Sequence, residues 1–291
     1  MFLSIEELIV QSKNFPSVAE LMIAQEIEFS GASRKKIRDT MQRNLEVMQS
    51  SVEEGIAGVK SVTGLTGGDA KKVNTYLENG DFLSGELILK AVRNAIATNE
   101  VNAKMGLICA TPTAGSAGVL AGVLTAIAEK KNFSLDEQID FLFTAGAFGL
   151  VIGNNASISG AEGGCQAEVG SASAMAAAAL VLFNGGNVEQ AGEAVAMTIK
   201  NMMGLICDPV AGLVEVPCVK RNALGSSLAF VSADLALAGV KSVIPADEVI
   251  DAMYKVGQQM PSMFKETAEG GLAQTPTALR LAKELGFAAE V

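Results

Sequence analysis

The stretch Val169–Phe183 reads VGSASAMAAAALVLF and is one of the longest charge-poor stretches of this sequence. It consists mainly of Ala, Gly and Ser rather than Leu and Ile. This composition suits a buried, tightly packed helix better than a membrane span. We therefore expect a helix over residues 166–183 to lie in the core of the protein and other helices to pack around it.

Helical spacing of apolar residues continues in both directions from this stretch. Beyond residue 105, the candidate helices are apolar on more than one face and should form the core: 115–131, 135–151, 166–183, 187–203, 219–240, 246–260 and 276–285. In the first 100 residues, the candidate helices have charged outer faces: 4–13, 17–30, 34–54, 69–79 and 84–104. N-cap signals, a serine followed three residues later by a glutamate, stand at Ser4, Ser17 and Ser134.

No stretch alternates apolar and polar residues over a full strand length. The sequence therefore predicts an all-α fold. We expect a single compact multi-helix domain over residues 1–291, with a peripheral part at about 1–104 and a core part at about 105–291.

Composition and charge restrict the possible functions. The chain has 291 residues, of which 49% are hydrophobic and 19% charged, enough apolar material for a large core. Its net charge of -10 provides no electrostatic driving force toward nucleic acid or anionic membranes. The chain has no histidine, so it cannot alone complete a histidine-based triad or a histidine-ligated metal site. The first ten residues carry Glu6 and Glu7 and no basic residue, unlike a signal peptide, and we expect a cytoplasmic protein.

Three of the four cysteines follow junctions marked by glycine or proline. Cys165 follows GAEGG, Cys207 follows GLI, and Cys218 follows VEVP. Three thiolates without a histidine favour soft-metal chemistry, either an iron-sulfur cluster or zinc. A structural zinc site usually has a fourth ligand and closely paired cysteines, and this chain lacks such pairs. A [4Fe-4S] cluster held by three cysteines would have one iron open to act as a Lewis acid.

The simpler interpretation is that the cysteines are small buried hydrophobic residues. Cys109, in the apolar run Gly106–Ala110, is the one we expect to be plain core.

Glycine-rich phrases recur between the candidate helices. MGLIC occurs at 105–109 and 203–207, AEGG at 161–164 and 268–271, and TPTA at 111–114 and 275–278. Such phrases recur by chance in a chain rich in Ala and Gly. The alternative is that these loops aim backbone N–H groups from several helix N-termini into one polar pocket that binds an anion.

Three longer segments contain these cysteines and one of these loops. They read GAEGGCQAEVGSA at 160–172, GLICDPVAGLVEVPC at 204–218 and ATPTAGSAG at 110–118. Together they closely resemble the alpha chains of bacterial iron-sulfur-dependent L-serine dehydratases, and the likeness covers nearly the whole chain.

This resemblance implies a mechanism without pyridoxal phosphate. L-serine would lose its α proton and its hydroxyl group, with a [4Fe-4S] cluster as the Lewis acid, to give pyruvate and ammonia. It makes Cys165, Cys207 and Cys218 the cluster ligands within the core part of the chain. It also makes the loop Thr111–Gly118 the binding segment for the substrate carboxylate, through Thr113, Gly115 and Ser116.

One feature of the resembled family is missing from this chain. The base in that family is thought to be a histidine of a second domain, which is a separate beta chain in some members. The chain contains neither that histidine nor that domain. The resemblance is thus to the two-chain form, and we expect an oligomer with a beta chain and little activity without it.

Other interpretations stay open at this point. Lys104, Lys200 and Lys220 invite a Schiff-base role, but pyridoxal phosphate enzymes of that kind need a parallel sheet that this sequence does not predict. Glu162 and Asp208 flank cysteines. They either help in proton transfer or in hydrogen bonding around the ligands, or are ordinary helix-cap or loop carboxylates. The rivals for the whole chain are a related hydro-lyase of another small hydroxy or amino acid and a non-catalytic helical scaffold.

Overall fold

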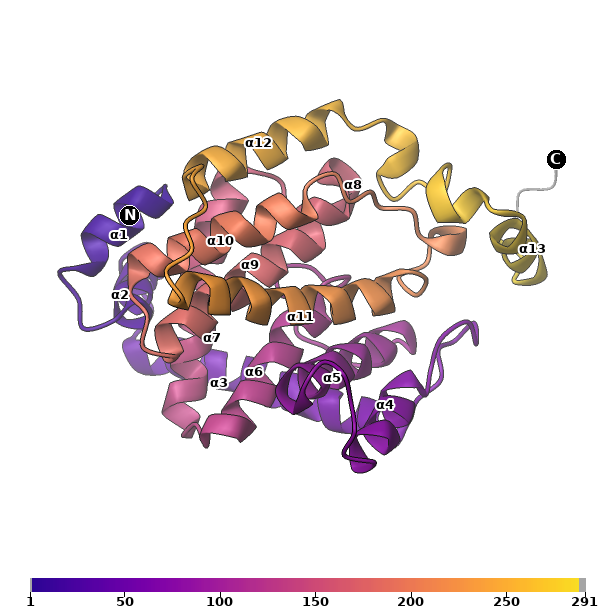
Figure 1. Cartoon of the computed structure of the whole chain (residues 1–291), viewed down its shortest axis with the longest axis horizontal. Helices are drawn as coiled ribbons and strands as arrows, with labels where there is room; N and C mark the ends of the chain where they lie inside the picture. Colours follow the sequence, from indigo (N-terminus) through magenta and orange to yellow (C-terminus); the bar gives the residue numbers. More distant parts are fainter. Residues whose placement is uncertain (1, 288–291) are drawn as a thin grey trace.

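Helix α9 (Cys165–Phe183) is central to the structure, and the other long helices surround it (Figure 1). It packs against α6 (Ala117–Lys131), α7 (Leu135–Asn155), α10 (Val188–Met202) and α11 (Cys218–Leu237). All of its residues except the last two are buried. Because its Ala, Gly and Ser side chains are short, several helices can approach its axis closely at once. By length and composition α9 could cross a membrane, but 89% of its apolar window is buried inside the protein. The expected buried core helix is therefore confirmed.

The computed structural model describes residues 2–287, which hold α-helices, three short 3-10 segments and no extended strand. The remaining helices are α1 (Ile5–Ser12), α2 (Val18–Ser30), α3 (Arg34–Ala57), α4 (Asp69–Glu78), α5 (Glu86–Ala103), α8 (Gly160–Gly163), α12 (Ala246–Gln259) and α13 (Pro276–Glu284). The 3-10 segments are η1 (Val210–Gly212), η2 (Ser262–Phe264) and η3 (Gly271–Gln274). The predicted all-α class is confirmed.

The predicted helix starts are explained by local hydrogen bonds. The side chains of Ser4, Ser17 and Ser134 each accept a hydrogen bond from the backbone N–H three residues later. At Ser134 the capping box is complete, because Glu137 accepts from the Ser134 backbone. In α1, Glu7 instead accepts from the backbone N–H of Leu3.

Two predicted helices begin one residue earlier than expected, and both new first residues are cysteines. Helix α9 begins at Cys165 rather than residue 166, and α11 begins at Cys218 rather than residue 219. The four-residue helix α8, just before α9, was not predicted because it has no apolar periodicity of its own. Two of the three cysteines that follow glycine- or proline-marked junctions therefore occupy helix N-termini.

Helices α5 and α6 approach each other through glycine. A Cβ atom on Gly118 would lie 2.3 Å from the backbone oxygen of Ala95, and one on Gly122 would lie 2.6 Å from that of Ala91. The two glycines are four residues apart on α6 and so lie on one face of the helix. This close contact sets the position of the loop that precedes α6.

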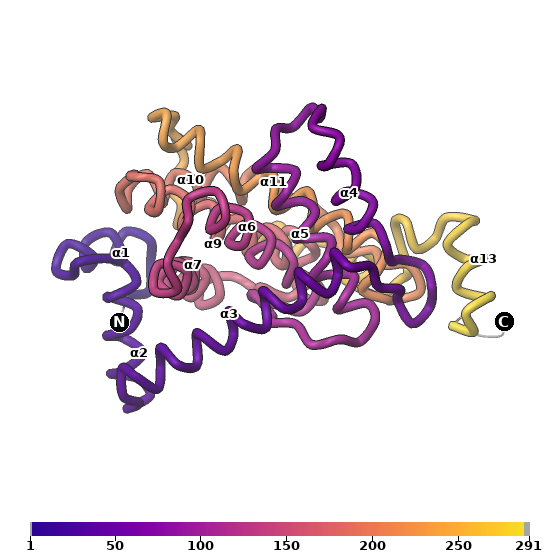
Figure 2. The backbone as a smooth tube through the Cα atoms, turned by 90° about the horizontal axis from the view of Figure 1, so that it is seen from below, coloured from indigo at the N-terminus to yellow at the C-terminus, as the bar shows by residue number. Residues whose placement is uncertain are grey.

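Helices α1 and α2 lie at one end of the molecule and α13 at the other in both views (Figures 1 and 2). Helix α12 runs beside α8 and α10. The main hydrophobic core contains residues from before and after residue 105, from Phe2 to Met253. The division into a peripheral part at 1–104 and a core part at 105–291 stays a prediction.

Candidate functional site

Three buried cysteines, distant in sequence, come from three different elements. Cys165 is the first residue of α9, Cys207 lies in the loop after α10, and Cys218 is the first residue of α11. Their exposed fractions are 1%, 3% and 5%. Cys109 differs, because it is only partly buried. Cys109 packs against the main hydrophobic core, so the expectation that it is plain core is met in part. It is also the cysteine with the most access to solvent.

The start of α9 depends on the glycine before Cys165. Gly164 has a positive φ of 76°, a conformation that side chains disfavour. A Cβ atom there would also lie 2.9 Å from the backbone oxygen of Leu205. Glycine at this position therefore lets the Cys165 segment and the Cys207 loop lie against each other.

Arg221 of α11 connects these segments. Its guanidinium donates hydrogen bonds to the Cys165 Sγ atom at 3.4 Å and to the Ile206 carbonyl at 2.9 Å. It also forms an ion pair of 2.8 Å with Asp208, and both side chains are largely buried. Asp208 in turn accepts from the backbone N–H of Leu272 at 2.7 Å. A single arginine thus holds the cysteine of α9 and the loop that carries Cys207.

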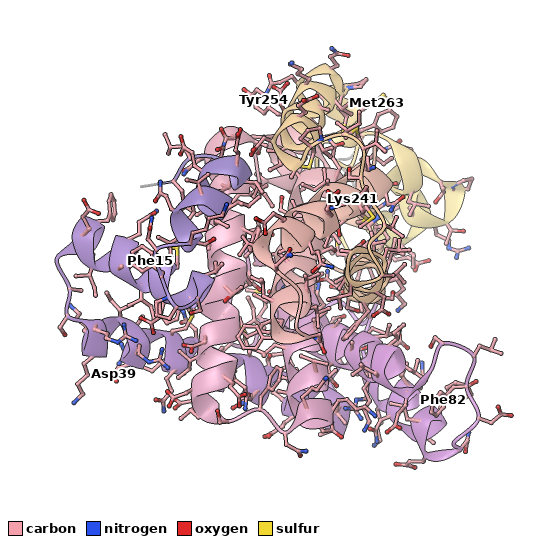
Figure 3. All side chains as sticks on the ribbon, turned by 60° about the vertical axis from the view of Figure 1, so that its left-hand side comes forward. Phe15, Asp39, Phe82, Lys241, Tyr254 and Met263 are labelled. Atoms are coloured by element: carbon pink, nitrogen blue, oxygen red, sulfur yellow. The ribbon has the colours of Figure 1, made fainter. Side chains whose placement is uncertain are left out.

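The segment after α12 holds the Cys207 loop from the other side. The Cys207 N–H donates to the Phe264 carbonyl at 2.8 Å, and the Cys207 carbonyl accepts from the Glu266 N–H at 2.9 Å. Figure 3 shows Met263 of this segment at the top of the view, near Tyr254 of α12.

The three thiols have different proton affinities. A hydrogen bond from Cys207, aided by the nearby Arg221 charge, lowers the pKa of the Cys165 thiol despite burial. The same hydrogen bond and burial raise the pKa of Cys207. Burial and the charges of Cys165 and Glu168 raise the pKa of Cys218. The three cysteines therefore influence one another electrostatically, and Cys165 is the one whose thiolate is favoured.

The loop 111–118, whose last two residues begin α6, lies beside this group. The carbonyl of Gly115 accepts hydrogen bonds from the side-chain amides of Asn222 at 2.7 Å and Asn99 at 3.0 Å. The Asn222 amide also donates to the Cys218 carbonyl at 2.9 Å. The predicted substrate loop is thereby tied to the turn of α11 that begins with Cys218.

Within this loop the three predicted substrate residues have different environments. The Ser116 side chain is fully buried, and its hydroxyl lies 3.1 Å from that of Thr113 and 3.3 Å from the Thr111 carbonyl. Ser116 therefore stabilises the turn. Thr113 is partly exposed, and Gly115 packs against the side chain of Glu168.

Glu168 is a buried carboxylate at the same place, one turn after Cys165 on α9, and 8% of its surface is exposed. Burial, and repulsion from Glu266, raise its pKa, whereas hydrogen bonds from Thr113 and the Gly160 backbone act in the opposite direction. A Cβ atom on Gly160 would lie 3.1 Å from the Cys207 Sγ atom and 3.5 Å from a carboxylate oxygen of both Glu168 and Glu266. Two carboxylates and a thiol therefore surround one glycine.

No group of three or more cysteine or acidic side chains within residues 2–287 is placed to hold one metal ion. A surface pocket of about 880 Å³ lies nearby, but it is lined by residues such as Glu162, Tyr254 and Lys265 and not by the cysteines. Glu162 lies in the first turn of α8, is exposed there and accepts a hydrogen bond from the Ser157 hydroxyl. The candidate site is therefore the buried group of cysteines, the loop 111–118 and Glu168.

Comparison with known proteins shows to which family this chain is related. The sequence profile of the family described as "Serine dehydratase alpha chain" matches residues 13–273. The chain belongs to the serine dehydratase alpha chain family. The matched region includes the segments 110–118, 160–172 and 204–218, so their resemblance to that family is confirmed.

Relatives of this alpha chain differ in length. It is 60% identical over 286 residues to the probable L-serine dehydratase alpha chain of Bacillus subtilis, covering 98% of this chain and 95% of the relative. It is 45% identical to the L-serine dehydratase alpha chain of Peptoniphilus asaccharolyticus, covering 92% of each. It is 36% identical to L-serine dehydratase 1 of Escherichia coli, covering 86% of this chain but only 57% of that longer relative.

The sequence motifs of this serine dehydratase alpha chain do not predict Arg221, Glu168 or Glu266 as site residues. For Arg221 and Glu168, however, the sequence does contain an indication. Each lies three residues after a cysteine that begins a helix, so each shares a helix face with that cysteine. Glu266 had no such signal, because its approach to Gly160 depends on a contact between distant segments.

Proposed function

We propose that this chain is the catalytic alpha chain of an L-serine dehydratase, which converts L-serine to pyruvate and ammonia together with a beta chain and a [4Fe-4S] cluster. The relatives named L-serine dehydratase support the reaction. The observation that carries the proposal is the meeting of three buried cysteines with the 111–118 loop and Glu168.

The donor set fits an iron-sulfur cluster better than a single ion. Cys165, Cys207 and Cys218 would hold the cluster, because thiolates are the usual ligands of iron-sulfur clusters, whereas a structural zinc ion usually has a fourth protein ligand. When bound, the cluster supplies a Lewis acid for the hydroxyl oxygen of the substrate at an iron without a cysteine.

The residues of this chain would bind the rest of the substrate. The partly exposed Thr113 hydroxyl and the backbone N–H groups of the loop, at the N-terminus of α6, suit a carboxylate. Ser116 contributes by holding the turn that presents these groups. The burial of the cysteines keeps water from the reacting hydroxyl group.

The chain does not supply a histidine base, so the α proton would be removed by a group from a beta chain. Two relatives are named alpha chains, and the longer Escherichia coli relative extends well beyond the matched region. Loss of the α proton and of the hydroxyl group as water gives aminoacrylate, whose hydrolysis gives pyruvate and ammonia. No pyridoxal phosphate takes part in this proposal.

The test is metal content after anaerobic reconstitution, followed by catalysis. We expect iron and acid-labile sulfide in equal amounts, with a visible absorption band, in the wild type and in Cys109→Ala. Cys165→Ala, Cys207→Ala and Cys218→Ala should each lose most of the iron. With a beta chain added, the wild type should form pyruvate from L-serine.

Cys109→Ala is the matched control, since it removes the one thiol outside the proposed ligand set. A wild type that takes up no iron, or a requirement for Cys109 in place of one of the other three, would contradict the cluster assignment. A loaded complex that forms no pyruvate would contradict the reaction.

A further inference from the structure

Glu168 lacks a basic partner although it is buried. None of the ion pairs in residues 2–287 includes Glu168 or Glu266, and the guanidinium of Arg221 pairs with Asp208 instead. A buried carboxylate without a cation is costly, and a second carboxylate nearby increases that cost. A cationic ligand bound beside Glu168 would offset this cost.

The position of the Glu168 carboxylate indicates which kind of cation could bind beside it. Its carboxylate contacts Gly115 and accepts a hydrogen bond from Thr113, both in the loop assigned to the substrate carboxylate. On its other side it accepts from the Gly160 backbone, where the Cys207 thiol also lies. It thus lies between the loop and the cysteines.

An α-amino acid has matching chemistry. Its ammonium and carboxylate groups are bonded to the same carbon atom, so the residues that receive them must be neighbours. Its hydroxymethyl group projects from that same carbon, which requires the third subsite to be adjacent as well. The loop 111–118, Glu168 and the cysteines are adjacent to one another, as these three subsites must be.

We propose that Glu168 receives the α-ammonium group of the substrate and thereby selects amino acids over hydroxy acids of the same size. This inference rests on the proposed function, because it assumes that the loop 111–118 and the cysteines form the substrate site. Glu266 adds negative charge from the other side of Gly160 and strengthens the attraction.

The experiment uses the cluster-loaded complex of alpha and beta chains and two ligands. L-serine carries the ammonium group, and 3-hydroxypropanoate has the same carboxylate and hydroxyl groups without it. Binding of each is measured by calorimetry, and pyruvate formation from L-serine is measured in parallel. In Glu168→Gln the shape of the side chain is kept and the charge is removed.

We expect Glu168→Gln to weaken L-serine binding about 10- to 100-fold, the usual effect of losing a charged hydrogen bond. Binding of 3-hydroxypropanoate should change less than about twofold, since it makes no contact with the lost charge. Iron content should equal that of the wild type, which a general loss of structure would not allow. Glu168→Asp, which keeps the charge, should bind L-serine more tightly than Glu168→Gln.

Glu269→Gln is the control, because Glu269 is an exposed glutamate in the same segment as Glu266. It makes the same change of charge and should leave both affinities unaltered. Glu266→Gln should weaken L-serine binding less than Glu168→Gln does.

The inference is overturned if Glu168→Gln binds L-serine like the wild type, or if it weakens both ligands equally. It is also overturned if the wild type prefers 3-hydroxypropanoate. A wild type that binds L-serine through Glu168 but forms no pyruvate would refute the proposed reaction and support the ammonium site.

Discussion

Arg221 shows how strongly this site depends on one side chain. Its guanidinium donates to the Cys165 sulfur and the Ile206 carbonyl and pairs with Asp208. These partners belong to two segments that are separate in sequence, so Arg221 keeps the two cysteine-bearing segments together. The Asp208 carboxylate extends the connection to Leu272 in η3.

Asp208→Asn should destabilise the protein by about 2 to 4 kcal/mol, because it removes the buried charge that Arg221 faces. Chemical denaturation of the metal-free chain measures this change in the free energy of unfolding. The matched control is Asp251→Asn, which breaks an exposed pair with Lys255 in α12. The control should cost at most about 0.5 kcal/mol. Equal losses in the two variants would mean that the Arg221 pair contributes no more than a surface pair.

The helices are joined by small residues as much as by large ones. Gly118 and Gly122 allow the backbone of α6 to contact that of α5, and α9 relies on Ala and Ser for close contact with α6, α7, α10 and α11 among its neighbours. Such packing leaves little free space. A larger side chain at one of these contacts would therefore push whole helices apart.

Gly122→Ala should destabilise the protein by about 1 to 3 kcal/mol, since its Cβ atom would lie 2.6 Å from the Ala91 carbonyl oxygen. Gly146→Ala in α7 is the control, because no atom lies within 4 Å of a Cβ atom there. That change should instead stabilise the protein by about 0.5 to 1 kcal/mol, as alanine favours helices over glycine. Thermal unfolding of both variants checks the opposite signs, and stabilisation of both would show that α5 and α6 can separate without cost.

The three cysteines tie together parts of the chain that are far apart in sequence. They lie at the start of α9, in the loop after α10 and at the start of α11. A cofactor bound to all three would link these elements in the folded state only. Its binding energy would therefore add to the free energy of unfolding.

Reconstitution with iron and sulfide should raise the midpoint of thermal unfolding by on the order of 5 to 10 °C, if each kcal/mol adds about 2 °C in a chain of this size. Anaerobic thermal unfolding, followed by circular dichroism, measures the shift. Cys109→Ala should show the full rise and Cys207→Ala little of it. The same rise in Cys207→Ala would mean that iron stabilises the protein at a different place.

Much of the fold could be read from the residues alone. The serine N-caps and the helical spacing around them act over a few residues, so Ser4, Ser17 and Ser134 mark helix starts correctly. The small-residue stretch of α9 predicts a buried helix, because only close neighbours can bury such short side chains. The motifs also select Cys165, Cys207 and Cys218, which are all buried, and their assignment as cluster ligands stays a prediction.

Which residues come together in the site is decided by the folded structure and could not be predicted from the sequence. Glu168, Arg221 and Glu266 meet Gly115, Cys165 and Gly160 through contacts across helices and loops. Likewise, only the packing of the 111–118 loop shows that Ser116 is buried within its turn. Helix starts follow from interactions within one turn of the chain, whereas these contacts depend on how α5, α6, α9 and α11 pack against one another. That packing is a sum of many long-range contacts, and no short segment of the sequence records it.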